Sequence, residues 1–158
     1  MKRATTWTIL LLSAMPVWAQ LTPTPLISPN AEANTAFGIS VSGAGDVNND
    51  GMPDVIVGAV DETVGGVSRA GRAYIFNGNT GALIRTLVSP NPITTGRFGQ
   101  TVSEAGDVNI DGFDDVMVTA LQEDGDAGRV YVFSGFDGSL LHTLESRFPN
   151  RLANLDLP

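Results

Sequence analysis

An internal repeat constrains the fold of this chain more than any other feature of the sequence. Residues 37–59 match residues 98–120 at a constant offset of 61, and residues 71–87 match residues 128–144 at an offset of 57. The loop between the matched stretches is therefore four residues shorter in the second copy. Because packed elements are kept while surface loops vary, the matched stretches are predicted to form the core.

Each copy is predicted to form four short strands, which in the first copy span residues 37–42, 54–60, 72–76 and 82–88. Apolar and small side chains alternate in these stretches, and Gly- and Asn-rich turns separate the last two strands of each copy. A repeat of about 60 residues built this way indicates a β-propeller blade and not a helical solenoid. The predicted fold class is all-β, with two four-stranded antiparallel blades that make up an incomplete β-propeller.

The turn after the first strand has the same acidic pattern in both copies. Residues 46–54 and 107–115 both fit D-x-N-x-D-G-x-x-D. Side-chain oxygens at positions 1, 3 and 5 can converge, Gly at position 6 allows a sharp turn, position 7 offers a backbone carbonyl, and Asp at position 9 closes the cage. Such hard oxygen ligands suit Ca²⁺ better than Mg²⁺ or Zn²⁺. The predicted ligands of two Ca²⁺ sites are Asp46, Asn48, Asp50, Met52 (carbonyl) and Asp54, and Asp107, Asn109, Asp111, Phe113 (carbonyl) and Asp115.

Two other structures use a similar loop pattern. An EF-hand needs Glu at position 12, where this chain has Val57 and Val118 inside strand-like runs, so the EF-hand is excluded. A metal-free turn, in which Asp and Asn bond to nearby backbone, remains the alternative. The repetition of all five positions of the D-x-N-x-D-G-x-x-D pattern, and the repulsion among three carboxylates within nine residues, favour the metal site.

The residues around these loops resemble the FG-GAP repeat, the blade unit of the integrin α-subunit propeller and of many bacterial secreted proteins. The resemblance covers about residues 24–145, with one departure, Thr119 in place of the Gly of the family pattern. It implies that the Asp and Asn side chains of both loops bind Ca²⁺, and that the protein functions in binding or adhesion. The motifs that carry it are Phe37-Gly38, Gly43-Ala44-Gly45-Asp46 and Val57-Gly58-Ala59, with Phe98-Gly99, Glu104-Ala105-Gly106-Asp107 and Val118-Thr119-Ala120 in the second copy.

The number of blades departs from that family, whose propellers have about seven. Two blades suggest a fragment of a longer protein, a ring assembled from several chains, or a short open stack. We favour the fragment because a third copy begins near residues 143–150, so further blades or self-association are expected. The predicted organisation is a signal peptide at 1–19, a strand or linker at 20–36, blades at 37–97 and 98–145, and a truncated third repeat or tail at 146–158.

The first residues are typical of a secretory signal peptide. Lys2 and Arg3 precede an apolar run at 7–17, and Ala19 provides a small residue for cleavage. The alternative, a membrane anchor, needs roughly 20 apolar residues, which this run does not reach. We therefore expect a bacterial protein secreted to the extracellular space or cell envelope, without a membrane span after cleavage.

The charge balance excludes some partners. After removal of the signal peptide, 17 acidic residues face seven arginines, so nucleic acid and anionic membranes are not expected partners. An extracellular protein or glycan is expected instead, bound at the variable loops 61–70 and 121–127.

No catalytic residues and no cofactor other than Ca²⁺ are predicted, and the chain is expected not to be an enzyme. His142, the only histidine, has no nucleophile beside it in the repeat and is expected to face solvent. A non-catalytic fragment of a secreted polysaccharide- or lipid-degrading enzyme and a structural surface array are the alternatives. The recurring aromatics could form a sugar platform, but equivalent strand positions favour core packing; they are Phe37, Tyr74, Phe76, Phe98, Tyr131 and Phe133.

Overall fold

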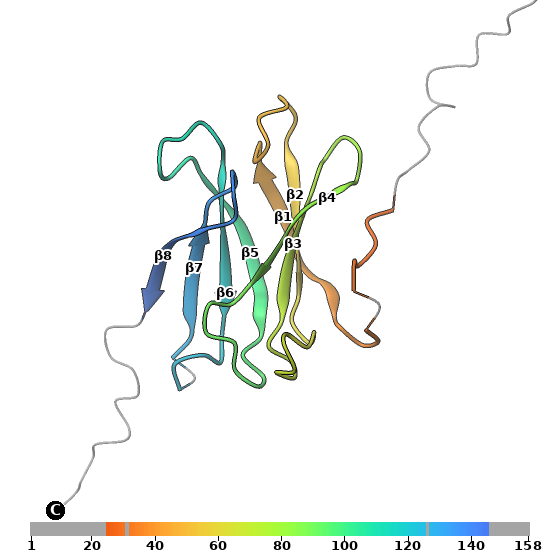
Figure 1. Cartoon of the computed structure of the whole chain (residues 1–158), viewed down its shortest axis with the longest axis vertical. Helices are drawn as coiled ribbons and strands as arrows, with labels where there is room; N and C mark the ends of the chain where they lie inside the picture. Colours follow the sequence, from red (N-terminus) through yellow and green to blue (C-terminus); the bar gives the residue numbers. More distant parts are fainter. Residues whose placement is uncertain (1–24, 31, 126, 146–158) are drawn as a thin grey trace, which may run out of the picture.

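The computed structural model describes residues 25–30, 32–125 and 127–145, which form two antiparallel four-stranded sheets lying side by side (Figure 1). The sheet of blade 1 consists of β1 (Phe37–Gly45), β2 (Asp54–Ala59), β3 (Arg72–Phe76) and β4 (Leu83–Val88). The sheet of blade 2 consists of β5 (Phe98–Gly106), β6 (Asp115–Ala120), β7 (Arg129–Phe133) and β8 (Leu140–Glu145). In both sheets the strands are ordered as in the chain.

The predicted all-β fold with two four-stranded meanders is confirmed. The first strand is longer than predicted, because residues up to Gly45 still pair with β2. The predicted signal peptide and the predicted third repeat lie outside the described residues, as does the start of the 20–36 segment. No helix in the described part of the chain is long and apolar enough to cross a membrane.

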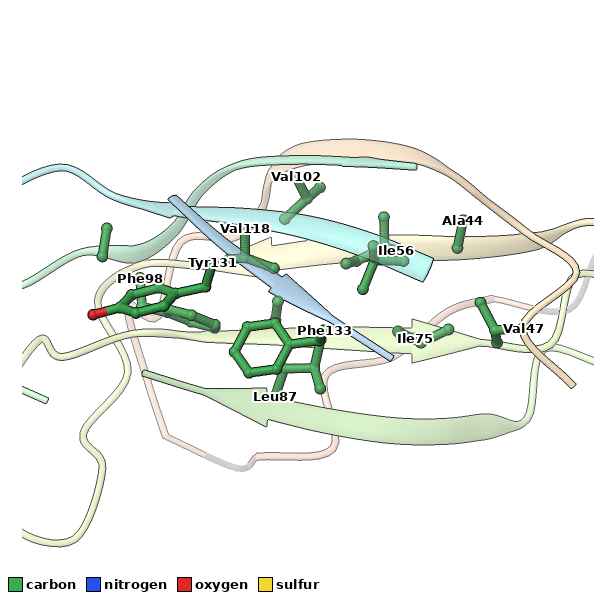
Figure 2. Close-up of a cluster of buried hydrophobic side chains, with 13 residues drawn as sticks. Ala44, Val47, Ile56, Ile75, Leu87, Phe98, Val102, Val118, Tyr131 and Phe133 are labelled. Atoms are coloured by element: carbon green, nitrogen blue, oxygen red, sulfur yellow. The ribbon is translucent and has the colours of Figure 1, made fainter. Parts of the chain in front are cut away.

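The main hydrophobic core lies between the two sheets (Figure 2). Ile56 and Ile75 of blade 1 pack with Phe98, Val118 and Tyr131 of blade 2 in one buried cluster. Because successive side chains of a strand point to opposite faces, the neighbours of Ile56 and Ile75 in sequence belong to the other face of blade 1. There they form a second cluster, made of Val57, Ala59, Tyr74 and Phe76, against which Leu26, Phe37 and Val55 pack.

The aromatic residues that recur between the copies are core residues, as predicted. Five of the six are buried, and Phe37 is partly buried beside Tyr74 and Phe76. Their ring centroids are 5.9 to 6.3 Å apart within each blade, in tilted or edge-to-face arrangements. These contacts are the ordinary packing of aromatic rings in a core.

The backbones of the two blades approach closely at glycines. A Cβ atom on Gly58 would overlap the carbonyl oxygen of Gly99, and a Cβ atom on Gly71 would overlap that of Phe98. Nearby, the N–H of Phe98 donates to the Ala70 carbonyl at 2.9 Å. The Phe-Gly pair that opens blade 2 therefore sits directly on the backbone of blade 1.

Candidate metal-binding loops

Loop 1, residues 46–54, joins β1 to β2 and curls around its own backbone. The carboxylate of Asp46 accepts hydrogen bonds from the N–H groups of Asp50 at 3.1 Å and Gly51 at 2.8 Å. The Asn48 side-chain oxygen accepts from the same Asp50 N–H at 3.0 Å. Oxygens from positions 1 and 3 therefore converge on a single backbone atom. Gly51, with φ of 83°, makes the turn that positions 5 and 6 require.

Both carboxylate oxygens of Asp50, the fifth position of loop 1, accept hydrogen bonds. Asp50 accepts from the Met52 N–H at 2.9 Å, and its second oxygen accepts from the side-chain amide of Asn77 at 2.5 Å. Asn77 follows β3, so this contact joins loop 1 to the turn between β3 and β4. Asn77 lies outside the loop pattern of the sequence, because 27 residues separate it from Asp50.

The ninth position is directed beneath the loop. Asp54 is 1% exposed, and its two oxygens accept from the N–H groups of Val47 and Gly78, each at 3.1 Å. Burial raises the pKa of Asp54 above its ordinary value, and the neighbouring carboxylates of Asp50 and Asp46 act in the same direction. The hydrogen bonds from Gly78 and Val47 oppose this shift. A divalent cation near these carboxylates would remove the repulsion among them.

Loop 2, residues 107–115, reproduces the backbone hydrogen bonds of loop 1, whereas the second oxygen of Asp111 accepts from the Asn109 side-chain amide at 2.8 Å. Asp107 accepts from the N–H groups of Asp111 at 3.0 Å and Gly112 at 2.9 Å, and Asn109 accepts from Asp111 at 3.0 Å. Asp111 accepts from the Phe113 N–H at 2.9 Å. The ninth residue is again buried beneath the loop, where Asp115 accepts from the N–H groups of Val108 at 2.8 Å and Gly135 at 3.0 Å.

The donor set of each loop fits Ca²⁺, because it consists of hard oxygens and carries three formal negative charges. The structure gathers positions 1, 3 and 5 at one turn and places position 9 below them. Within the described ranges, no three His, Cys, Asp or Glu side chains form a ready-made metal cluster. Each carboxylate oxygen has a further lone pair, so a cation could be bound while most of these hydrogen bonds are kept.

Asp114 connects loop 1 to blade 2. Its carboxylate accepts from the Asp46 N–H at 2.8 Å, and its own N–H donates to the Asp46 carbonyl at 3.2 Å. The sequence gives one signal for Asp114, an acidic residue at position 8 of loop 2 where loop 1 has Pro53. A comparison of the copies cannot show that Asp114 reaches the other loop. The loop 1 end of blade 1 is therefore held in part by a residue of blade 2.

Replacing Asp114 with alanine is expected to lower the free energy of unfolding by about 1 to 2 kcal/mol, because the Asp46 N–H loses its acceptor. Urea unfolding followed by far-UV circular dichroism measures the change. The matched control is Glu104→Ala, which removes the same charge from an exposed side chain with no hydrogen bond to any described residue. An equal loss in both variants would assign the effect to net charge.

Two buried glutamates, absent from the predicted sites, stabilise the ends of the blades. Glu62 is fully buried and accepts from Arg72 at 3.0 Å, from the Tyr74 hydroxyl at 2.5 Å and from Ser28 at 3.2 Å. Its counterpart Glu123 accepts from the Tyr131 hydroxyl at 2.5 Å. Both glutamates are bonded to a core tyrosine, which supports a structural role, and the second oxygen of Glu123 has no hydrogen-bond partner among the described residues.

Tyr74 is expected to make stability depend on alkaline pH. Burial and the adjacent Glu62 carboxylate raise the pKa of Tyr74 to about 12. A raised pKa favours the protonated form in the folded state, so this contribution is complete below pH 10 and is lost as pH rises from 10 to about 12. The loss at pH 11 is about 1 kcal/mol. Urea unfolding at pH 9 and 11 should show a smaller difference for Tyr74→Phe than for the parent protein, and an unchanged difference would contradict this assignment.

The predicted solvent-facing position of His142 is confirmed, since its side chain is exposed on β8. Arg129 lies near carboxylates, 2.9 Å from Glu145 and 3.7 Å from Asp124. Arg129, Asp124 and Glu145 belong to blade 2 and lie outside both acidic loops.

Comparison with known proteins agrees with the geometry. The FG-GAP repeat family matches residues 37–76 and 98–133, which contain β1 to β3 and β5 to β7. Integrin alpha-4 of Xenopus laevis is 32% identical over 114 residues, 70% of this chain and 11% of that protein. Integrin alpha-2 of Bos taurus is 34% identical over 104 residues, 64% of this chain and 9% of that protein. Integrin alpha-PS5 of Drosophila melanogaster is 34% identical over 105 residues, 66% of this chain and 10% of that protein.

The chain thus spans about a tenth of the length of these relatives. The family match falls once on each sheet and includes both acidic loops. The repeat seen in the sequence, the two sheets of the structure and the two matched stretches are the same units. The chain belongs to the FG-GAP repeat family, with one repeat in each blade.

Proposed function

We propose that this chain is an exported, non-catalytic adhesion module that binds one structural Ca²⁺ in each acidic loop and a protein or glycan outside the cell. The observation that carries the calcium assignment is the agreement between the loops. The side chains at positions 1, 3, 5 and 9 accept hydrogen bonds from equivalent backbone N–H groups in both copies, although positions 4, 7 and 8 differ. Similarity to integrin α-subunits supports the adhesion role.

Bound Ca²⁺ would supply positive charge that offsets the repulsion among the loop carboxylates. Asp46, Asn48 and Asp50 would bind it from the exposed turn, and Asp54 from below. In loop 2 the corresponding residues are Asp107, Asn109, Asp111 and Asp115. The role of the ion is structural, because each loop joins the first two strands of its blade and loop 1 also contacts Asp114 of blade 2.

Isothermal titration of the metal-free chain with CaCl₂ tests the sites directly. We expect two bound ions per chain, with a Kd on the order of 10⁻⁴ to 10⁻³ M, as in other extracellular calcium modules. Asp50→Ala should remove one ion and Asp111→Ala the other. Absence of binding heat at millimolar Ca²⁺ for the parent chain would rule out the calcium assignment.

The adhesion role is tested by binding of the labelled chain to glycan arrays and to immobilised extracellular proteins. The loops between β2 and β3 of blade 1 and between β6 and β7 of blade 2 are the proposed contact surface, because they differ in length and sequence between the copies. Exchange of the exposed residues of one loop for those of the other, with the buried Glu62, Ala70 and Glu123 kept, should change the bound partner and leave the fold intact. A partner whose binding is unaffected by both exchanges would place the contact elsewhere.

A further inference from the structure

Each blade has two faces, and in the contact between the blades they use different ones. One face of blade 1 and the other kind of face of blade 2 are therefore not covered by a blade. Blade 1 covers the Phe-Gly face of blade 2, and its own Phe-Gly face carries Phe37, Tyr74 and Phe76. Blade 2 has an outer face formed by the sides of β6, β7 and β8 that point away from blade 1. Because the blades are repeats, these two remaining faces correspond to the two that are joined. A head-to-tail contact of this kind can add further copies.

The outer face of blade 2 carries exposed apolar side chains at two positions whose counterparts in blade 1 are buried. Leu87 is 3% exposed in the core between the blades, whereas its counterpart Leu144 is 52% exposed. Val47 is fully buried, whereas its counterpart Val108 is 43% exposed. The difference arises because blade 2 covers the first residue of each pair, and no described residue covers the second in the same way. This face is therefore a copy of one half of the existing interface.

Thr119 blocks this face. It occupies the position of Gly58, whose missing Cβ allows the Gly99 carbonyl oxygen to approach. The Thr119 hydroxyl accepts a hydrogen bond from the Thr101 N–H at 2.9 Å, which fixes the side chain on its own sheet. Thr119 also lines a groove of about 330 Å³ on this face, together with Leu121, Val130 and Leu144. A blade docking as blade 2 docks on blade 1 would place a backbone carbonyl onto the Cβ of Thr119.

The Phe-Gly face of blade 1 is blocked by a segment before β1. Leu26 lies 61 positions before Leu87 and packs against the cluster that contains Tyr74 and Phe76. Ser28 accepts from the Asn30 N–H at 3.2 Å, and its counterpart Ser89 accepts from the Asn91 N–H at 3.0 Å. Residues 26–30, here called the N-terminal cap, therefore lie on blade 1 as the end of β4 lies on blade 2.

The cap is also bonded to the core of blade 1. The Ser28 hydroxyl donates to the fully buried Glu62 at 3.2 Å. In a head-to-tail contact, Leu144 of the incoming copy would occupy the place that Leu26 holds, because Leu26, Leu87 and Leu144 are equivalent positions. The cap and a second copy of the chain cannot occupy this face together.

We propose that Leu26 of the N-terminal cap and Thr119 together prevent a second copy of this chain from docking head to tail, and that removal of these two side chains converts the two faces into a self-association interface. The partner is another copy of the same chain, because each face corresponds to one side of the contact between blades 1 and 2. Neither block lies in an acidic loop, although Val108 of loop 2 belongs to the outer face of blade 2.

Sedimentation velocity of the full chain over a range of concentrations tests the proposal. The parent protein, Leu26→Ala and Thr119→Gly are expected to sediment as monomers. The double variant Leu26→Ala/Thr119→Gly is expected to show a sedimentation coefficient that rises with concentration. Circular dichroism of each variant confirms that the sheets are intact, since Leu26 is only partly buried and Thr119 is not in the core cluster.

The matched control is Leu26→Ala/Thr119→Ser, which keeps a Cβ atom at the blocking position and is expected to remain monomeric. Assembly of the parent protein would show that the two blocks do not prevent docking. Assembly of a single variant would show that the remaining block is not sufficient. Either result would overturn the proposal. A double variant with glycine that stays monomeric at its highest soluble concentration would overturn it as well. Assembly of the serine control would show that the Cβ of residue 119 is not the block.

Discussion

Substitution of Gly58 by threonine is expected to break the contact between the two blades. The new Cβ would overlap the carbonyl oxygen of Gly99, and this oxygen belongs to backbone that is itself held against blade 1. A Cβ on Gly99 would in turn overlap the carbonyl oxygen of Arg72, so the two backbones have no room to move apart locally. We expect a loss of about 3 kcal/mol or more, the upper range for overpacking.

Urea unfolding followed by far-UV circular dichroism and by tyrosine fluorescence measures this loss. Tyr131 lies in the core between the blades and Tyr74 on the opposite face of blade 1, so the fluorescence of single Tyr→Phe backgrounds reports each side. Gly58→Ala should lose nearly as much stability as Gly58→Thr, because the Cβ atom alone causes the overlap. Unfolding curves of the two variants that coincide with that of the parent would contradict the proposed interface.

Thr119→Gly provides the matched control for this substitution. It makes the reverse change at the equivalent position of blade 2, on the side of β6 that no described blade covers, whereas Val118 on the other side packs against blade 1. We expect a loss of about 1 kcal/mol from lower strand propensity and the lost hydrogen bond to Thr101. A large loss in Gly58→Thr with a small one in Thr119→Gly would show that the environment of the position decides the effect.

Much of the fold could be predicted because the sequence repeats. The strands, the antiparallel order and the buried aromatics follow from local alternation and from equivalent positions in the two copies. The extension of β1 to Gly45 was missed because Ala44 and Gly45 give little propensity signal, although Ala44 is fully buried in the core between the blades. Local patterns thus predict which residues are inside but not where a strand ends.

Contacts between the repeats could not be predicted in the same way. Asp114 reaches Asp46 across 68 residues, and Gly58 faces Gly99 only because the two sheets pack at one particular offset. Comparison of the copies shows that Thr119 differs from Gly58, but the consequence of the difference depends on which face of each strand is covered. The candidate loops could be predicted only in part. The spacing of their residues predicts which side chains take part, whereas the buried position of Asp54 and the contact of Asp50 with Asn77 are seen only in the structure.

The placement of Asp54 and Asp115 has a consequence for stability. Both are buried carboxylates that tie their loop to the N–H groups of the turn after the third strand, at Gly78 and Gly135. The conformation of each loop is therefore coupled to the structure of its blade without any ion. A cation bound above Asp54 or Asp115 would further stabilise a loop that is already formed. We infer that removal of calcium loosens the blades and does not abolish the sheets.

Addition of Ca²⁺ is accordingly expected to raise the melting temperature of the chain. With two sites of Kd on the order of 10⁻⁴ to 10⁻³ M, about 10 mM Ca²⁺ contributes roughly 3 to 5 kcal/mol by mass action. For a domain of this size the shift is on the order of 10 °C relative to a sample in chelator. Differential scanning calorimetry in Ca²⁺, in Mg²⁺ and in chelator measures it, and Mg²⁺ should have a much smaller effect because it requires octahedral geometry.

The double variant Asp50→Ala/Asp111→Ala is expected to melt at the same temperature with and without Ca²⁺. Asp50 and Asp111 are exposed, so their replacement removes a ligand from each loop without opening a cavity in the core. The matched control, Asp61→Ala/Asp124→Ala, removes the same charge outside the loops and should keep the calcium shift. A calcium shift that persists in the loop variant and disappears in the control would locate the ion elsewhere, whereas equal shifts in all three proteins would reduce the effect to screening of an acidic surface.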